Sequence, residues 1–185
     1  MPDGLRDALR DRGFLSYRVM IYERHWDGDG RFRHPDEYPR QALAMVATHD
    51  MAPLADYWRG TDVERRARLG LYPEPAMRDQ EARARHGERD GLVALLDSLG
   101  LAPGDRDDAG AVIAALHGAI GRTRAMLAAV QLDDVVGETE PVNIPGTHLE
   151  WPNWRRKLAL PLEAILDDPR WAALARSMRA AGRGR

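Results

Sequence analysis

A short apolar run that ends in three polar residues constrains the fold of this chain more than any other feature. The run covers residues 42–47, and Thr48, His49 and Asp50 follow it directly. A short apolar run with titratable residues at its end is typical of a buried parallel strand, whose carboxyl end is where α/β proteins place their chemistry. Asp50 is therefore the first candidate site residue.

Two further runs predict strands of the same kind. Residues 17–22 are rich in β-branched and aromatic side chains and end at Glu23, and residues 126–132 end at Asp133 and Asp134. Such compositions are typical of strands. Because stretches with helical character separate the three runs, the sequence predicts a helix-rich α/β protein with a parallel sheet.

Helical periodicity accounts for most of the remaining chain. The predicted helices cover residues 3–12, 53–59, 62–69 with Thr61 as the N-cap, 77–99, 111–121, 154–166 and 168–180. The 77–99 helix has one apolar face, so we expect an outer helix packed on that side. Residues 24–39 and 141–152 contain prolines and glycines and predict loops. His117 lies among apolar residues and is expected to be a packed histidine.

Composition excludes several classes of function. The net charge is −2, without the basic excess of a nucleic-acid surface, so no nucleic-acid partner is expected. The chain has no cysteine, which excludes disulfides and thiolate chemistry. No apolar run approaches the roughly 20 residues that span a bilayer, and a charged stretch rather than a signal peptide follows Met1. We therefore expect a cytoplasmic protein with no membrane partner.

The histidines and aspartates do not predict a metal site. Those within residues 25–34, together with His49 and Asp50, lack the HxH or HxxxH spacing of metal ligands. Residues 27–30 read Asp-Gly-Asp-Gly but lack the later ligands of a calcium loop. No glycine-rich phosphate loop is present. The sequence therefore predicts neither a metal nor a cofactor.

Five short stretches carry a family resemblance. Residues 48–58 read THDMAPLADYW, and they are followed in order by 69–73 (LGLYP), 131–138 (QLDDVVGE), 142–147 (VNIPGT) and 152–157 (PNWRRK). The first resembles the seventh-strand motif of the amylomaltases, the 4-alpha-glucanotransferases of the alpha-amylase clan. The others are similar to the same family in the same order. The chain thus resembles the carboxyl-terminal portion of a family member.

The resemblance implies a fold and a division of the chain. The three predicted strands would be strands six, seven and eight of a (β/α)8 barrel of the TIM type. Residues 1–185 would form a single partial barrel domain. Within it, 1–60 would hold strands six and seven with the site loop, 61–124 an outer helical region, and 125–185 strand eight and the last helices.

The resemblance also implies a chemistry. The family transfers α-1,4-glucan segments between maltodextrins without a cofactor, by a retaining mechanism that needs a nucleophile and an acid/base carboxyl about 5 Å apart. The family carries these groups after its fourth and fifth strands, which would lie upstream of Met1. Asp50 matches the third carboxylate, which stabilises the transition state. His49 matches a histidine that binds the same sugar, and Asn143 an asparagine that lines the glucan site.

Several aromatic and basic residues near these motifs have two interpretations. Trp151, Trp154 and the pair 57–58 either stack on sugar rings or pack against the barrel, and packing is preferred for Trp154 because burial is the usual role of a large aromatic. The two arginines at 155–156 are expected to pair with carboxylates such as Glu150.

Three strands alone cannot close a barrel, because each strand of a barrel pairs with two neighbours. Both sheet edges would expose unpaired backbone, so we expect the isolated chain to be marginally stable and prone to associate. We expect it to be inactive because the resemblance places both catalytic carboxyl groups upstream of Met1. The expected partners are α-1,4-glucans and the remaining part of the barrel. The alternative hypothesis is a short protein that binds glucans or a partner without catalysis, or the product of a truncated gene.

Overall fold

The computed structural model describes residues 4–184. The elements run in the order α1 (Leu5–Asp11), β1 (Ser16–Val19), the 3-10 helix η1 (Met20–Tyr22), the 3-10 helix η2 (Pro35–Glu37), β2 (Ala42–Met45), α2 (Leu54–Arg59), α3 (Thr61–Arg68), α4 (Pro75–Ser98), α5 (Ala109–Gly121), β3 (Leu127–Ala128), α6 (Leu132–Val136), α7 (Leu162–Leu166) and α8 (Pro169–Ala180). This mixture of helices with a small sheet confirms the predicted helix-rich α/β class.

The three strands form one parallel sheet in the order β1-β2-β3. In its register Tyr17 lies opposite Leu43, which lies opposite Leu127. Aligned residues of neighbouring strands point to the same face of a sheet. The row Tyr17, Leu43 and Leu127 therefore lies on one face, and Ala42 and Ala44 lie on the other.

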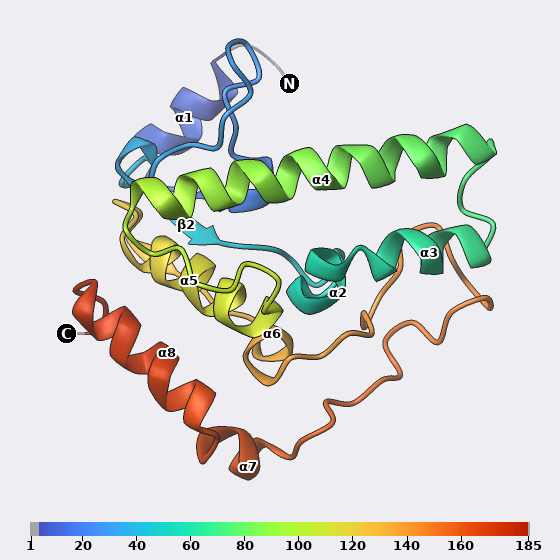
Figure 1. Ribbon diagram of the computed structural model, residues 1–185. Coiled ribbons are helices and arrows are strands. Elements are labelled where there is room, and N and C mark those ends of the chain that lie inside the picture. Colours follow the sequence, from blue (N-terminus) through green and yellow to red (C-terminus); the bar gives the residue numbers. More distant parts are fainter. Residues whose placement is uncertain (1–3, 185) are drawn as a thin grey trace.

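Among residues 4–184, helices pack on the face of the sheet that carries the two alanines. Ala42 and Ala44 are fully buried in a core that also contains Leu96 of α4 and Ile120 of α5. In Figure 1, α5 runs close to β2, and α8 packs against α5 on the side away from the sheet. The opposite face, with half-exposed Tyr17 and Leu127, is open. We call the row Tyr17, Leu43 and Leu127 the open face.

All three strands end earlier than predicted: β2 stops at Met45 rather than at residue 47, and the other two differ more. The strand predicted over 17–22 ends at Val19, because residues 20–22 turn into η1 and the Glu23 amide donates back to the carbonyl groups of Val19 and Met20. The strand predicted over 126–132 shrinks to Leu127–Ala128, and Leu132 begins α6. In both places local hydrogen bonding overrides the strand propensity of the apolar run.

The helix predicted over 154–166 is wrong in its first half. Trp154 has φ of 62°, outside the helical region, and its amide donates to the carbonyl of Val142 at 2.9 Å. Pro161, which cannot sit inside a helix, becomes the N-cap of the short α7. Thr61 is not an N-cap either, because Gly60, with φ of 75°, occupies that position.

Candidate functional site

The loop after β2 presents His49 and Asp50 at the surface, where both side chains are more than half exposed. The Asp50 amide donates to Oγ1 of Thr48 at 3.3 Å, and the Met51 amide donates to the Thr48 carbonyl at 3.0 Å. These two bonds form a tight turn, since a threonine hydroxyl can take the place of a backbone acceptor. The turn places the Asp50 carboxylate at the carboxyl edge of the sheet.

Asn143 reaches the same point from the loop after β3 and α6. Its Nδ2 donates to Oδ1 of Asp50 at 2.7 Å, although 93 residues separate the two in sequence. Nε2 of His49 lies 3.3 Å from Oδ2 of the same carboxylate. The structure therefore brings together all three residues that the sequence singles out, because the carboxyl ends of parallel strands meet at one edge of the sheet.

Asn153 holds the Asn143 loop in shape. Its Oδ1 accepts the Ile144 amide at 2.9 Å, and its Nδ2 donates to the carbonyl and the hydroxyl of Thr147 at 3.2 and 2.9 Å. An amide side chain that bonds to polar groups on both arms of a loop can fix the path of that loop without the regular hydrogen bonds of a sheet or helix. The 152–157 stretch gives the family resemblance, but periodicity alone does not reveal this role for Asn153.

Trp154 is exposed rather than packed, which corrects the preferred interpretation. The residue is 62% exposed, and its ring centroid lies 5.4 Å from that of His49 with the rings tilted by 57°. Its positive φ is a conformation that costs free energy for a residue with a side chain. By contrast, Tyr57 and Trp58 are buried, and Nε1 of Trp151 donates to the Pro141 carbonyl at 3.1 Å.

A cavity of about 390 Å³ adjoins this edge of the sheet. Asp50 and Asn143 line it from the two loops, while Arg66, Glu81 and Arg85 line it from α3 and α4. Its volume lies within the range of small-molecule sites. The cavity thus combines two of the three predicted site residues, Asp50 and Asn143, with a wall of charged side chains, while His49 does not line it.

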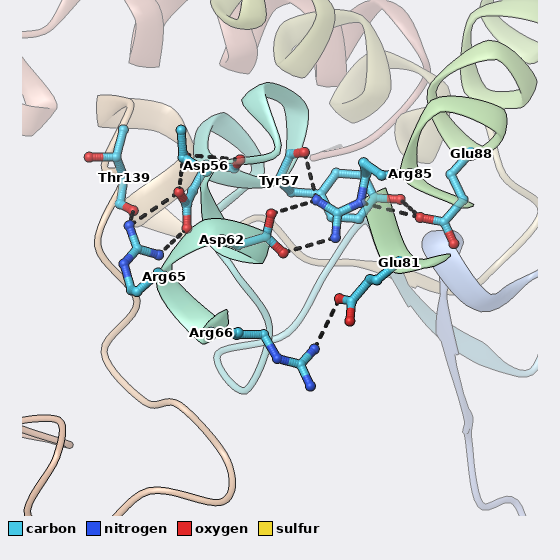
Figure 2. A network of polar contacts seen from close by, with 10 residues as sticks. Asp56, Tyr57, Asp62, Arg65, Arg66, Glu81, Arg85, Glu88 and Thr139 are labelled. Carbon is cyan, nitrogen blue, oxygen red and sulfur yellow. Dashed lines mark hydrogen bonds and ion pairs between the residues drawn. The ribbon is translucent and has the colours of Figure 1, made fainter. Parts of the chain in front are cut away.

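A buried ion pair forms the centre of that wall (Figure 2). Arg85 donates to both carboxylate oxygens of Asp62, at 2.6 and 2.8 Å, and to the Tyr57 carbonyl at 2.8 Å. Burial opposes the charge, but the hydrogen bonds and charge of Asp62 outweigh it and raise the Arg85 pKa. Burial and the hydrogen bond to Glu88 raise the pKa of the Tyr57 hydroxyl, so this phenol stays neutral.

Further ion pairs tie neighbouring segments to this wall. Arg65 binds the buried carboxylate of Asp56 and donates to the Thr139 carbonyl at 2.9 Å, so α3 is linked to the chain after α6 (Figure 2). Arg66 and Glu81 pair at 3.0 Å between α3 and α4. Charge-assisted pairs of this kind restrict how the helices can move past one another.

Arg156 pairs with carboxylates as expected, but Glu150 is not among them. Arg156 pairs with Glu138 and lies 3.8 Å from Asp133, whereas Glu150 accepts the amide of His148 at 2.7 Å. Burial raises the Glu138 pKa, but the hydrogen bond from Arg156 outweighs it, and the net shift of this pKa is downward. Arg156 therefore fastens the chain after α6 and does not face the site.

Across residues 4–184, no group of three or more His, Asp or Glu side chains is placed to hold a metal ion. No helix within this described part is long and apolar enough to span a membrane.

The fold and the site together define a class. A carboxylate and an amide that meet at the carboxyl edge of a parallel sheet, beside a polar cavity, are typical of α/β enzymes. The sequence profile described as 4-alpha-glucanotransferase matches residues 1–162. The chain belongs to the 4-alpha-glucanotransferase family, which confirms the resemblance seen in its motifs.

Individual relatives agree with this assignment. The chain is 38% identical to a 4-alpha-glucanotransferase of Mycobacterium tuberculosis and 28% identical to one of Haemophilus influenzae, over 96% and 91% of its length. These alignments cover 25% and 24% of the two relatives, so the chain spans about a quarter of their length.

Solved structures show the same fold. The crystal structure of amylomaltase from Corynebacterium glutamicum matches with a TM-score of 0.87 at 25% identity, over 96% of this chain and 27% of the other. Amylomaltase from Streptococcus agalactiae in complex with acarbose matches with a TM-score of 0.65 at 14% identity, over 100% of this chain and 30% of the other.

Proposed function

We propose that this chain forms the donor-sugar subsite of a 4-alpha-glucanotransferase that transfers α-1,4-glucan segments between maltodextrins by a retaining mechanism. The observation that carries the proposal is the 2.7 Å hydrogen bond from Asn143 to Asp50, which joins two distant loops into one polar site. The family assignment supplies the reaction, and the strand-end loops supply the groups that contact the sugar.

Each residue has a distinct task in this proposal. The Asp50 carboxylate accepts hydrogen bonds from sugar hydroxyls and stabilises the positive charge that develops on the ring in an oxocarbenium-like transition state. His49 donates to the same sugar, and Asn143 holds one carboxylate oxygen while it contacts the glucan. The exposed ring of Trp154 offers an apolar face beside His49, on which a pyranose can stack.

The nucleophile and the acid/base come from outside this chain in this proposal. A retaining enzyme needs two carboxyl groups about 5 Å apart, and the family carries them after other strands of its barrel. We infer that β1, β2 and β3 are strands six, seven and eight of that barrel. The open face supports this inference, because the side chains of Tyr17 and Leu127, which are exposed here, would point into the packed interior of a closed barrel.

Binding and turnover test the two parts of the proposal separately. Titration of the chain with maltotriose, followed by NMR, should show saturable binding that Asp50→Ala abolishes. Asp107→Ala, at an exposed aspartate between α4 and α5, is the matched control and should bind like the unaltered chain. A disproportionation assay should yield no glucose from the chain alone. Glucose and longer dextrins would contradict the inference that the catalytic pair is supplied from elsewhere.

The open face also favours a second candidate function, which is non-catalytic binding of a glucan or of a barrel-forming partner. In that case maltotriose binding would persist, but addition of the remaining barrel segments as a separate polypeptide would restore no transfer activity. Activity that appears on mixing the two polypeptides, and that Asp50→Ala removes, would favour the transferase.

A further inference from the structure

Asp134 acts as the N-terminal cap of a helix 80 residues away. Its Oδ1 accepts the Leu54 amide at 2.8 Å, and Leu54 is the first residue of α2. The first amides of a helix have no acceptor within that helix. Pro53, the N-cap residue, has no polar side chain to supply one. The carboxylate from α6 therefore satisfies a donor that the local sequence leaves open.

This bond joins the two helices that border the loops of the candidate site: α2 follows the Asp50 loop, and α6 precedes the Asn143 loop. Leu54 follows Asp50 by four positions, and Asn143 follows Asp134 by nine. The bond between Asp134 and Leu54 is buried, whereas the bond between Asn143 and Asp50 lies at the surface. The two segments are thus linked at two separate points, once between the loops and once between the adjoining helices, and this restricts how the surface pair can rotate or slide.

We propose that Asp134 is a positioning residue: by capping α2 across the fold, it sets the loop after β2 against the loop after β3 and so fixes Asp50 relative to Asn143. The benefit to sugar binding rests on the proposed function, while the positioning itself does not. Charge-assisted bonds from a carboxylate to a helix amide are among the stronger hydrogen bonds in proteins, so one such bond can hold a short loop.

The surroundings of Asp134 show that its charge is costly to keep. The residue is 3% exposed, and burial raises its pKa to about 6 against the opposing hydrogen bonds from Leu54 and Gln131. His117 of α5 faces it, with Nε2 at 3.8 Å from Oδ2, and Asp133 adds a like charge. An apolar residue here would avoid the desolvation cost, so a carboxyl at this position has to contribute through its specific bond.

A purely stabilising cap and a positioning cap predict different results. If Asp134 only stabilises α2, its loss lowers overall stability without moving the surface pair. If it positions the loops, its loss changes the environment of the Asn143 side chain, and an isosteric acceptor restores that environment. Asp134→Asn keeps a carbonyl oxygen for the Leu54 amide, whereas Asp134→Ala removes the acceptor.

The experiment compares amide spectra and hydrogen exchange of the 185-residue chain with those of Asp134→Ala and Asp134→Asn. Asp133→Ala is the control, because Asp133 faces Arg156 instead of Leu54. In Asp134→Ala we expect the Leu54 amide to exchange at least about tenfold faster, because it loses one charge-assisted hydrogen bond. We also expect the side-chain amide resonances of Asn143 to shift. Asp134→Asn should retain both signals, and Asp133→Ala should leave both unchanged.

Two outcomes would overturn the proposal: an unchanged Leu54 amide in Asp134→Ala, or a faster Leu54 amide with unmoved Asn143 resonances. Maltotriose titration of the same variants adds a separate result. Affinity that falls in Asp134→Ala and returns in Asp134→Asn extends the positioning to sugar binding. If the unaltered chain does not bind maltotriose, the donor-subsite proposal fails, and the amide signals still decide whether Asp134 positions the loops.

Discussion

Arg85 carries a full charge at a position where the residue is only 7% exposed. Its guanidinium depends on Asp62 and the Tyr57 carbonyl for compensation, so Arg85→Met would leave the Asp62 carboxylate buried without its partner. Removal of one member of a buried pair typically costs about 3–5 kcal/mol. We therefore expect this loss in the free energy of unfolding of Arg85→Met, measured by urea titration.

Two further variants show whether the charge is the cause. Asp62→Asn added to Arg85→Met should recover at least half of the lost stability, because the double variant has no uncompensated buried charge. Arg78→Met removes a pair with Glu64 in which both side chains are about half exposed, and it should leave the urea midpoint nearly unchanged. No recovery in the double variant would mean that lost packing, not charge, dominates.

His117 and Asp134 should give opposite pH dependences of stability. Burial lowers the His117 pKa from 6.5 to about 4, so its contribution is complete above pH 6.5 and is lost as the pH falls through 4. Burial raises the Asp134 pKa from 3.8 to about 6, so its contribution is complete below pH 3.8 and is lost as the pH rises through 6.

The two effects can be separated by variants measured between pH 7 and pH 4.5. Relative to the unaltered chain, His117→Leu should gain unfolding free energy as the pH falls, whereas Asp134→Asn should lose it, each by up to about 1.4 kcal/mol per pH unit. Subtracting the unfolding free energy of the unaltered chain at each pH removes the pH dependence that comes from carboxylates present in all three proteins. If both differences grow as the pH falls, the Asp134 shift is wrongly assigned, and if both shrink, the His117 shift is wrongly assigned.

At the scale of elements, α4 contains two glycines whose surroundings differ. A Cβ at Gly87 would meet nothing within 4 Å, whereas a Cβ at Gly91 would lie 3.0 Å from Cε2 of Phe32. Phe32 is buried, and the Arg24 guanidinium lies 4.5 Å from its ring centroid, so this ring has little room to move.

Alanine at the two positions should therefore act in opposite directions. Gly87→Ala should stabilise the protein by about 0.5–1 kcal/mol, because alanine loses less backbone entropy in a helix. Gly91→Ala gains the same helix propensity, but its new methyl group presses against the Phe32 ring. This variant should therefore be about 1–3 kcal/mol less stable than Gly87→Ala. Thermal unfolding of the two variants measures this difference. Equal melting temperatures would show that the Phe32 ring moves aside without a cost in stability.

The elements that could be predicted from the sequence are those that depend on local pattern. The amphipathic helix α4 and the short apolar run of β2 appear within about two residues of their predicted bounds. The loop at Trp154 could not be predicted, because the Trp154 amide donates to the carbonyl of Val142, twelve residues earlier, and the neighbouring Asn153 side chain accepts the amide of Ile144. Local propensity therefore favoured a helix where long-range bonds impose a loop.

At the scale of the whole molecule, the site was predictable in part. Asp50 and Asn143 could be singled out by their motifs and by their positions after two strands, since parallel strands bring their carboxyl ends together. The hydrogen bond from the Leu54 amide to Asp134 could not be predicted, because no local sequence pattern indicates a bond between residues 80 positions apart. The cavity wall around Arg85 likewise depends on how α3 and α4 pack, which no single stretch of sequence specifies.

The open face leads to a prediction about the chain in isolation. Tyr17 and Leu127 are 54% and 51% exposed on the two outer strands, and within residues 4–184 each of these strands pairs with β2 alone. Apolar strands with a free edge associate with other copies through backbone hydrogen bonds and side-chain burial. We expect the purified chain to form oligomers whose size grows with concentration in sedimentation velocity experiments.

Charge on this face should reverse the association. Tyr17→Lys and Leu127→Lys, made together, place like charges where two copies would meet, so the monomer fraction should rise at every concentration. Leu149→Lys is the matched control: Leu149 is 85% exposed but lies in the loop before Trp151 and belongs to none of the strands, so its substitution should leave the oligomers unchanged. A chain that stays monomeric at high concentration and melts at high temperature would show that three strands form a stable sheet without the other strands of a barrel.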